Sequence, residues 1–248
     1  MNCHILIPRS VLNEFVNDKK HYFKYEVKYD RIITGFSKTT FTEEDYYSKA
    51  MEGDLNKYIE TPLKKLLDYA RQLPTKNTYI IERDVLDVAK LYFKSLTARN
   101  PLYFNIVIED GVHLQFLSNQ EKHDLVVSDA MADSNLNLAE NLYDFTFMVN
   151  ATQTPFVIPI RGFYEYAIKG VECINVPLTP WCALILKRKG KSISESGNDS
   201  VFVIPSGHDD VILRMNGFAF VQQKNDGIGC VVSHDKSLLC QLQQIYSQ

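Results

Sequence analysis

The stretch Asp84-Val-Leu-Asp-Val-Ala-Lys-Leu-Tyr-Phe-Lys-Ser-Leu-Thr-Ala-Arg-Asn-Pro101 predicts the clearest helix of the chain. Its apolar residues recur at the spacing of an α-helix, so one side of the helix is expected to face a core. These residues are Val85, Val88, Ala89, Tyr92, Phe93 and Leu96. We expect the Asp84 carboxylate to cap the first turn, and Pro101 to end the helix because proline disfavours a helical residue before it.

Arg99 is the unusual residue of this stretch. It lies three residues after Leu96, so its side chain is expected on the same buried side of the helix. A buried guanidinium without acceptors costs several kcal/mol. The rest of the chain is therefore expected to supply a partner for Arg99.

The composition is typical of a soluble globular protein. The 248 residues are 45% hydrophobic and 23% charged, which is enough chain to bury a sizeable core. The net charge is -3, so no overall positive field favours nonspecific binding to nucleic acid. No run approaches the roughly 20 apolar residues that a membrane span requires.

The cysteines and the N-terminal segment indicate a cytoplasmic protein. The five cysteines fit neither a disulfide scaffold nor a zinc ribbon in their spacing: Cys3, Cys173, Cys182, Cys230 and Cys240. We expect them to be reduced thiols. The first residues carry no basic segment and only a short apolar run, so no signal peptide is predicted.

Further helices and a series of strands are predicted around the first helix. One helix covers Asp54–Arg71, with a kink or restart at Pro62, a second covers Asp209–Lys224, and Asp235 caps a last one. Strands and hairpins are predicted over His21–Tyr29, Tyr103–Leu117, Leu142–Val149, Pro155–Ile160, Val171–Val176, Ala183–Lys187 and Val201–Ile204.

This order predicts an α+β fold. A helical N-terminal half, about residues 1–101, packs on a largely antiparallel β-rich C-terminal half, about 102–248, which two helices close. No strong linker separates the halves, so we predict a single domain over residues 1–248.

Several short motifs occur in a fixed order along the chain. The first are His4, Ile7, Pro8, Leu12 and Phe15, followed by Phe23-x-Tyr25, Tyr46-Tyr47, Ile59-Glu60, Arg99-Asn100-Pro101, Pro155-Phe156, Pro177-Leu178-x-Pro180 and Asn216. In these motifs the chain resembles a bacterial family of uncharacterised proteins, the domain-of-unknown-function family numbered 4238. The resemblance covers nearly the whole chain and implies its architecture. It implies no activity, because none is established for the family.

One departure from the family pattern follows Pro155 and Phe156. The resemblance implies a Ser-Asp-x-Pro turn at this point, whereas this chain continues with Val157-Ile-Pro-Ile-Arg-Gly162. The acidic residue is missing. If that Asp does chemistry in the relatives, this protein is inactive or uses another group.

Five polar residues lie on or beside apolar patterns, where a buried polar group needs a partner: His4, Arg9, Glu60, Arg99 and Asn216. One hypothesis is an active-site pocket in which His4 acts as acid or base and Glu60 orients His4 or a water. Arg9, Arg99 and Asn216 would then bind an anion such as phosphate. The alternative is a structural network in which Glu60 neutralises Arg99 and His4 is a core histidine.

Other candidates carry weaker signals. Cys230, His234 and Cys240 match the spacing of no known zinc site, so no metal is predicted. The basic run Lys187-Arg188-Lys189-Gly-Lys191 is expected to be a solvated loop, although it could contact a phosphate backbone or an acidic partner. The sequence names no cofactor.

The residue types favour hydrolysis of a phosphate-containing substrate, a nucleotide or nucleic acid. The resemblance, and not the residues, implies that this intracellular protein is bacterial and suggests a defence or toxin-like setting. The competing hypothesis is a non-enzymatic binding or regulatory module whose polar cluster is structural, and the missing Ser-Asp turn favours it. The sequence does not decide between an enzyme and a binding module. The expected ligand contains phosphate, the partner could be nucleic acid or a protein, and no membrane contact is expected.

Overall fold

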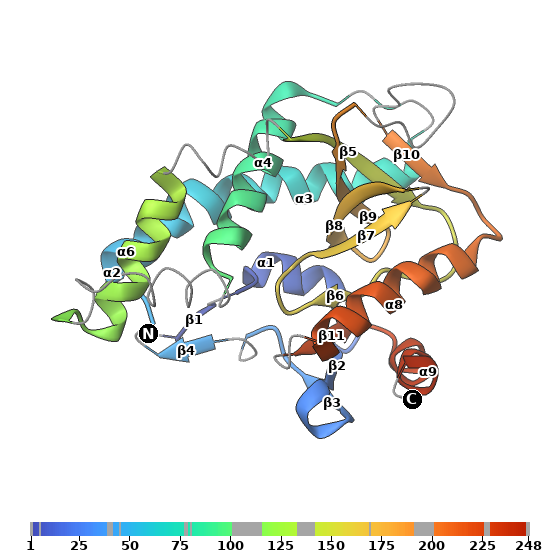
Figure 1. Ribbon diagram of the computed structural model, residues 1–248, viewed down its shortest axis with the longest axis horizontal. Coiled ribbons are helices and arrows are strands. Elements are labelled where there is room, and N and C mark those ends of the chain that lie inside the picture. Colours follow the sequence, from blue (N-terminus) through green and yellow to red (C-terminus); the bar gives the residue numbers. More distant parts are fainter. Residues whose placement is uncertain are drawn as a thin grey trace.

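The computed structural model describes residues 2–4, 6–38, 42–44, 46–76, 79, 81–100, 116–132, 142–168, 170–190, 201–225 and 229–246. Within these ranges the chain forms three β-sheets with helices packed around them (Figure 1). The predicted α+β class is confirmed. The hairpin predicted over Tyr103–Leu117 falls almost entirely outside the described residues.

The largest sheet has five strands in the order β10 (Val201–Ile204), β5 (Tyr143–Asn150), β9 (Cys182–Arg188), β8 (Val171–Thr179) and β7 (Tyr164–Ile168). Its pairs are antiparallel except for β10 with β5. A smaller antiparallel pair joins β1 (Asn2–His4) to β4 (Thr42–Glu44). The predicted predominance of antiparallel pairing is confirmed.

The third sheet joins the two ends of the sequence. Its order is β3 (Arg31–Gly35), β2 (Tyr22–Glu26), β11 (Cys230–Ser233) and β6 (Ile158–Pro159). Strand β11 pairs with β2, so N-terminal and C-terminal segments share one sheet. The boundary between a helical and a β-rich half is therefore less sharp than the sequence predicts, because strand pairing depends on partners distant in the chain.

Strand β9 explains why the five-stranded sheet is apolar on both faces. Leu184 and Leu186 belong to one buried cluster, whereas Ala183 and Ile185 belong to the other. Successive side chains of a strand point to opposite faces, so a continuous apolar run is required when both faces are covered. One cluster includes helices α3 and α4, and the other includes α8 and α9.

The helices form two groups, one on each side of the five-stranded sheet (Figure 1). One group comprises α1 (Arg9–Leu12), α2 (Lys49–Leu55), α3 (Thr61–Gln72), α4 (Arg83–Ala98) and α6 (Asn119–Ala132). The other comprises α8 (Asp209–Asn225) and α9 (Lys236–Tyr246). Short turns are η1 (Asn13–Phe15), η2 (Val27–Tyr29), η3 (Asn56–Glu60) and η4 (Leu73–Thr75). None of the helices in the described ranges is both long and apolar enough to cross a lipid bilayer.

Helix α4 is the helix predicted from the opening stretch, and its apolar side is buried. The prediction that Asp84 caps it is wrong. The N-cap position is Glu82, without a side-chain cap, and the Asp84 carboxylate instead binds the Lys65 ammonium of α3. The helix begins at Arg83, one residue before Asp84. Arg83 is polar, so it adds nothing to the apolar pattern from which the start of the helix is predicted. The cap predicted at Asp235 is confirmed, since its carboxylate accepts the Ser237 N–H at 2.8 Å.

Candidate functional site

The end of α4 places Arg99 in the interior. Arg99 follows the last helical residue, keeps a helical backbone and donates its N–H to the Ser95 carbonyl at 3.1 Å. This holds the side chain on the side of α4 that carries Leu96, which is buried. Only 1% of the Arg99 side chain is exposed, as its spacing from Leu96 predicts.

The Arg99 guanidinium has a charged neighbour but no hydrogen bond among the described residues. Among the described residues the nearest carboxylate oxygen is Glu60 Oε1, which lies 3.9 Å from Arg99 Nη2, too far for a hydrogen bond. The buried Nε, Nη1 and Nη2 atoms have no acceptor within the described part of the chain. An arginine side chain offers five N–H donors, and each buried donor without an acceptor costs free energy. A ligand that supplies acceptors here would remove that cost.

Tyr92 adds a second unsatisfied group to the cluster. It lies seven residues before Arg99, two turns back on the same side of α4. Its hydroxyl is buried and has no hydrogen-bond partner in the described ranges. Burial raises the pKa of Tyr92 far above its usual value, while Arg99 lowers and Glu60 raises that pKa. The Tyr92 hydroxyl is therefore neutral and can donate a hydrogen bond. It lies close enough to Arg99 and Glu60 for their charges to affect its pKa. We name these three residues the Arg99 cluster.

A π turn positions Glu60. Helix α2 continues through η3 into α3, and the Thr61 N–H binds the Asn56 carbonyl five residues earlier. Pro62 has no N–H for the carbonyl four residues before it, so the helix changes its hydrogen-bond spacing just ahead of the proline. The kink predicted at Pro62 thus takes the form of a π turn. Ile59 packs into the core, and the Glu60 side chain stays 31% exposed beside Arg99.

The other predicted site residues lie in three separate environments. His4 ends β1, where its backbone is paired opposite Thr42, and its side chain is outside the described part of the structure. Arg9 is exposed at the start of α1. Asn216 is buried in α8, and its amide holds the chain after β5: Oδ1 accepts the Val157 N–H at 3.1 Å and Nδ2 donates to the Pro155 carbonyl at 2.8 Å. The structure therefore brings Glu60 and Arg99 together, and it gives Asn216 backbone partners of its own.

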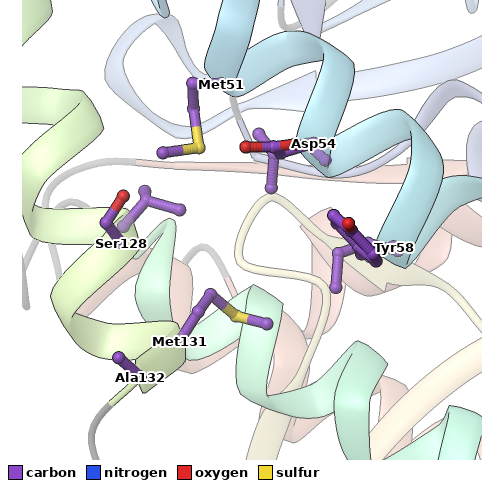
Figure 2. Close-up of a pocket in the computed structure, with 9 residues that line it drawn as sticks. Met51, Asp54, Tyr58, Ser128, Met131 and Ala132 are labelled. Carbon is purple, nitrogen blue, oxygen red and sulfur yellow. The ribbon is translucent and has the colours of Figure 1, made fainter.

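An apolar groove of about 370 Å³ lies between the α2–η3 helix and α6. Met51, Asp54 and Tyr58 face Ser128 and Met131 of α6 across it (Figure 2). Tyr58 and Ile59, which directly precede Glu60, belong to its wall. The π turn therefore presents Tyr58 to this groove and Glu60 to Arg99.

Tyr92 is the member of the cluster that sequence reasoning missed. Helical periodicity assigns it to the apolar side of α4, and it is indeed buried. The sequence does offer a signal for it: a tyrosine seven residues before Arg99 lies on the same side of the helix, and its buried hydroxyl needs a partner. As for metal ligands, no group of three His, Cys, Asp or Glu side chains comes together among the residues that the structure describes.

No protein-family model, curated protein or solved structure matches the chain. The resemblance to the domain-of-unknown-function family therefore stays a prediction, and the chemistry of the site has to be argued from its own residues.

Proposed function

We propose that the protein binds a phosphate-containing ligand, a nucleotide or nucleic acid, at the Arg99 cluster and hydrolyses it. The observation that carries the proposal is the buried Arg99 guanidinium, whose Nε, Nη1 and Nη2 have no acceptor among the described residues. The planar fork of an arginine matches two oxygens of a phosphate, and charge-assisted hydrogen bonds of this kind are strong. A phosphate oxygen would satisfy donors that the described part of the fold leaves unpaired.

Tyr92 and Glu60 would supply the remaining interactions. The neutral Tyr92 hydroxyl can donate to another phosphate oxygen, because burial keeps its pKa high. Glu60 is the partly exposed edge of the cluster, so its carboxylate can orient or activate a water that enters from solvent. The predicted part of His4 as acid or base is left out of this proposal, because the structure describes only its backbone, paired with Thr42.

A cytoplasmic, intracellular setting fits the cysteines. Cys173, Cys182, Cys230 and Cys240 are free thiols, and the first three are buried. Burial raises the pKa of Cys230 to about 12 and that of Cys173 to about 11, so neither is a reactive thiolate at neutral pH. The proposed chemistry therefore uses neither Cys173 nor Cys230 as a nucleophile.

The second candidate is a binding or regulatory module in which the Arg99 cluster is structural. The observation that favours it is the 1% exposure of Arg99 next to Glu60, an arrangement that also suits a buried ion pair. In that case the cluster would organise the end of α4 and would turn over no substrate.

The test is a hydrolysis panel with the intact chain. The substrates are a phosphomonoester, a phosphodiester, ATP and single-stranded RNA, each measured with wild type, Arg99→Met, Glu60→Gln and the control Arg214→Met. Arg214 is an exposed residue of α8, paired with Asp210. We expect one substrate class to be hydrolysed by wild type and Arg214→Met and not by the two cluster variants. Ligand binding without turnover that is equal in wild type, Arg99→Met and Glu60→Gln would support the binding module instead.

A further inference from the structure

A second hollow, of about 260 Å³, is built from segments that are far apart in the sequence. Its walls come from Val16 after η1, Arg71 near the end of α3, the turn between β8 and β9, and His234 between β11 and α9. None of the residues of the Arg99 cluster lines it. We name it the Trp181 hollow, because Trp181 is the single tryptophan of the chain and lies in the β8–β9 turn.

The charged groups of the Trp181 hollow neutralise one another. Arg71 donates from Nε to Glu14 Oε2 at 2.9 Å and from Nη2 to Glu14 Oε1 at 2.7 Å. Its Nη1 binds Asp68. The fork of Arg71 is thus occupied by carboxylates, so it is not available to a phosphate. The wall that carries the ion pair therefore favours an uncharged ligand.

His234 lines the hollow with a partly exposed imidazole ring. Its Nδ1 is buried and has no hydrogen-bond partner in the described part of the chain. Burial lowers the pKa of His234, and the neighbouring Asp235 and Asp18 offset only part of this effect. The imidazole is therefore neutral at pH 7, and it can form a hydrogen bond with an uncharged group.

Trp181 supplies a flat apolar surface on a rigid turn. Its backbone N–H donates to Thr179 Oγ1 at 3.2 Å, and its carbonyl accepts the Asn150 N–H at 2.9 Å. The preceding Pro180 carbonyl accepts the Phe156 N–H at 2.8 Å. The centres of the Trp181 and His234 rings lie 6.3 Å apart. A stacking surface and a polar edge are thus held close to each other before any ligand arrives.

We propose that the Trp181 hollow binds an uncharged planar heterocycle of nucleobase size, stacked on Trp181 and hydrogen-bonded at its edge to His234. Aromatic side chains stack on every base, and hydrogen bonds to the base edge add selectivity. The volume lies just below the roughly 300 Å³ at which sites for drug-sized ligands begin, so it suits a single ring system. The base could belong to a free nucleoside or to a single-stranded nucleic acid. The proposal does not depend on the Arg99 cluster.

The test is a fluorescence titration of the intact chain, in which the single tryptophan reports directly on the hollow. The ligands are the four common ribonucleosides and, in a separate arm, a short single-stranded oligonucleotide. The proteins are wild type, His234→Ala, Val16→Phe, which fills the hollow, and the control His208→Ala at an exposed histidine. Arg99→Met is titrated in parallel, and we expect it to bind like wild type.

We expect saturable quenching in wild type and His208→Ala, and an affinity about tenfold weaker in His234→Ala, as the loss of one buried hydrogen bond predicts. Val16→Phe should abolish the quenching and keeps the test decisive if His234→Ala does not fold. Quenching by nucleosides identifies a free base as ligand, and quenching by the oligonucleotide alone identifies a nucleic acid. The absence of saturable quenching in both arms would overturn the proposal, as would equal affinity in wild type and both hollow variants.

Discussion

Replacing Arg99 by methionine distinguishes between two interpretations of Arg99, an anion-binding site and a structural ion pair. Methionine keeps most of the side-chain length and removes the buried charge. The attraction between Arg99 and Glu60 at 3.9 Å amounts to about 4 kcal/mol at an effective dielectric constant of about 20. Against it stand the desolvation of the guanidinium, several kcal/mol, and about 1–3 kcal/mol for each buried donor that stays unpaired. These opposing terms are at least as large as the attraction.

We therefore expect Arg99→Met to have the stability of wild type, or about 1–4 kcal/mol more, in buffer free of phosphate and sulfate. Glu60 tolerates the loss of its neighbour because its side chain is 31% exposed. The assay is equilibrium unfolding in urea, with Arg214→Met as a control that should change stability by less than about 0.5 kcal/mol. A loss of about 3–5 kcal/mol in Arg99→Met would instead show that Arg99 and Glu60 form a satisfied buried pair, because that is the cost of breaking one.

Three further predictions concern the fold around the site. Asn216→Ala leaves the Val157 N–H and the Pro155 carbonyl unpaired, which costs about 1–3 kcal/mol for each group. Urea unfolding should therefore show a loss of about 2–6 kcal/mol in the free energy of unfolding. A loss below about 1 kcal/mol would contradict the role of these two hydrogen bonds. Gly162→Ala should destabilise by more than about 1 kcal/mol, because Gly162 has a φ of +79° and an added methyl group would come within 2.8 Å of Leu96; thermal unfolding at wild-type level would contradict this packing. The pKa of His234 in the folded protein lies below its ordinary value of 6.5, so the unfolded chain takes up the proton first as the pH falls. The stability that is present above pH 6.5 is therefore lost as the pH falls through the folded-state pKa. His234→Gln should lose less stability over this pH range than wild type, and an equal loss in both proteins would rule out this contribution.

Sequence reasoning predicted the elements whose signals are local. Long apolar runs predicted strands β5, β8, β9 and β10 close to their observed bounds, because such runs suit a sheet buried on both faces. Helical periodicity predicted α4 and the burial of Arg99. The proximity of Glu60 and Arg99 was also anticipated, from the need of a buried charge for a partner.

The features that sequence reasoning missed depend on contacts between distant segments. Asn216 needed buried partners, as predicted, but those partners are backbone groups 59 and 61 residues away in the chain. Pro62 predicted a break in the helix without specifying a π turn. The Trp181 hollow combines Val16, Arg71, Trp181 and His234, and no spacing rule connects residues so far apart. The pairing of β2 with β11 has the same origin.

Whether Arg99 binds a phosphate group can be tested by measuring unfolding with and without inorganic phosphate at constant ionic strength. A ligand that binds only the folded state stabilises it by about 2.7 kcal/mol at about 100 times its Kd. We expect phosphate to raise the stability and Tm of wild type and of Arg214→Met, and to leave those of Arg99→Met unchanged. The same phosphate response in Arg99→Met as in wild type, or no response in wild type, would contradict phosphate binding at Arg99.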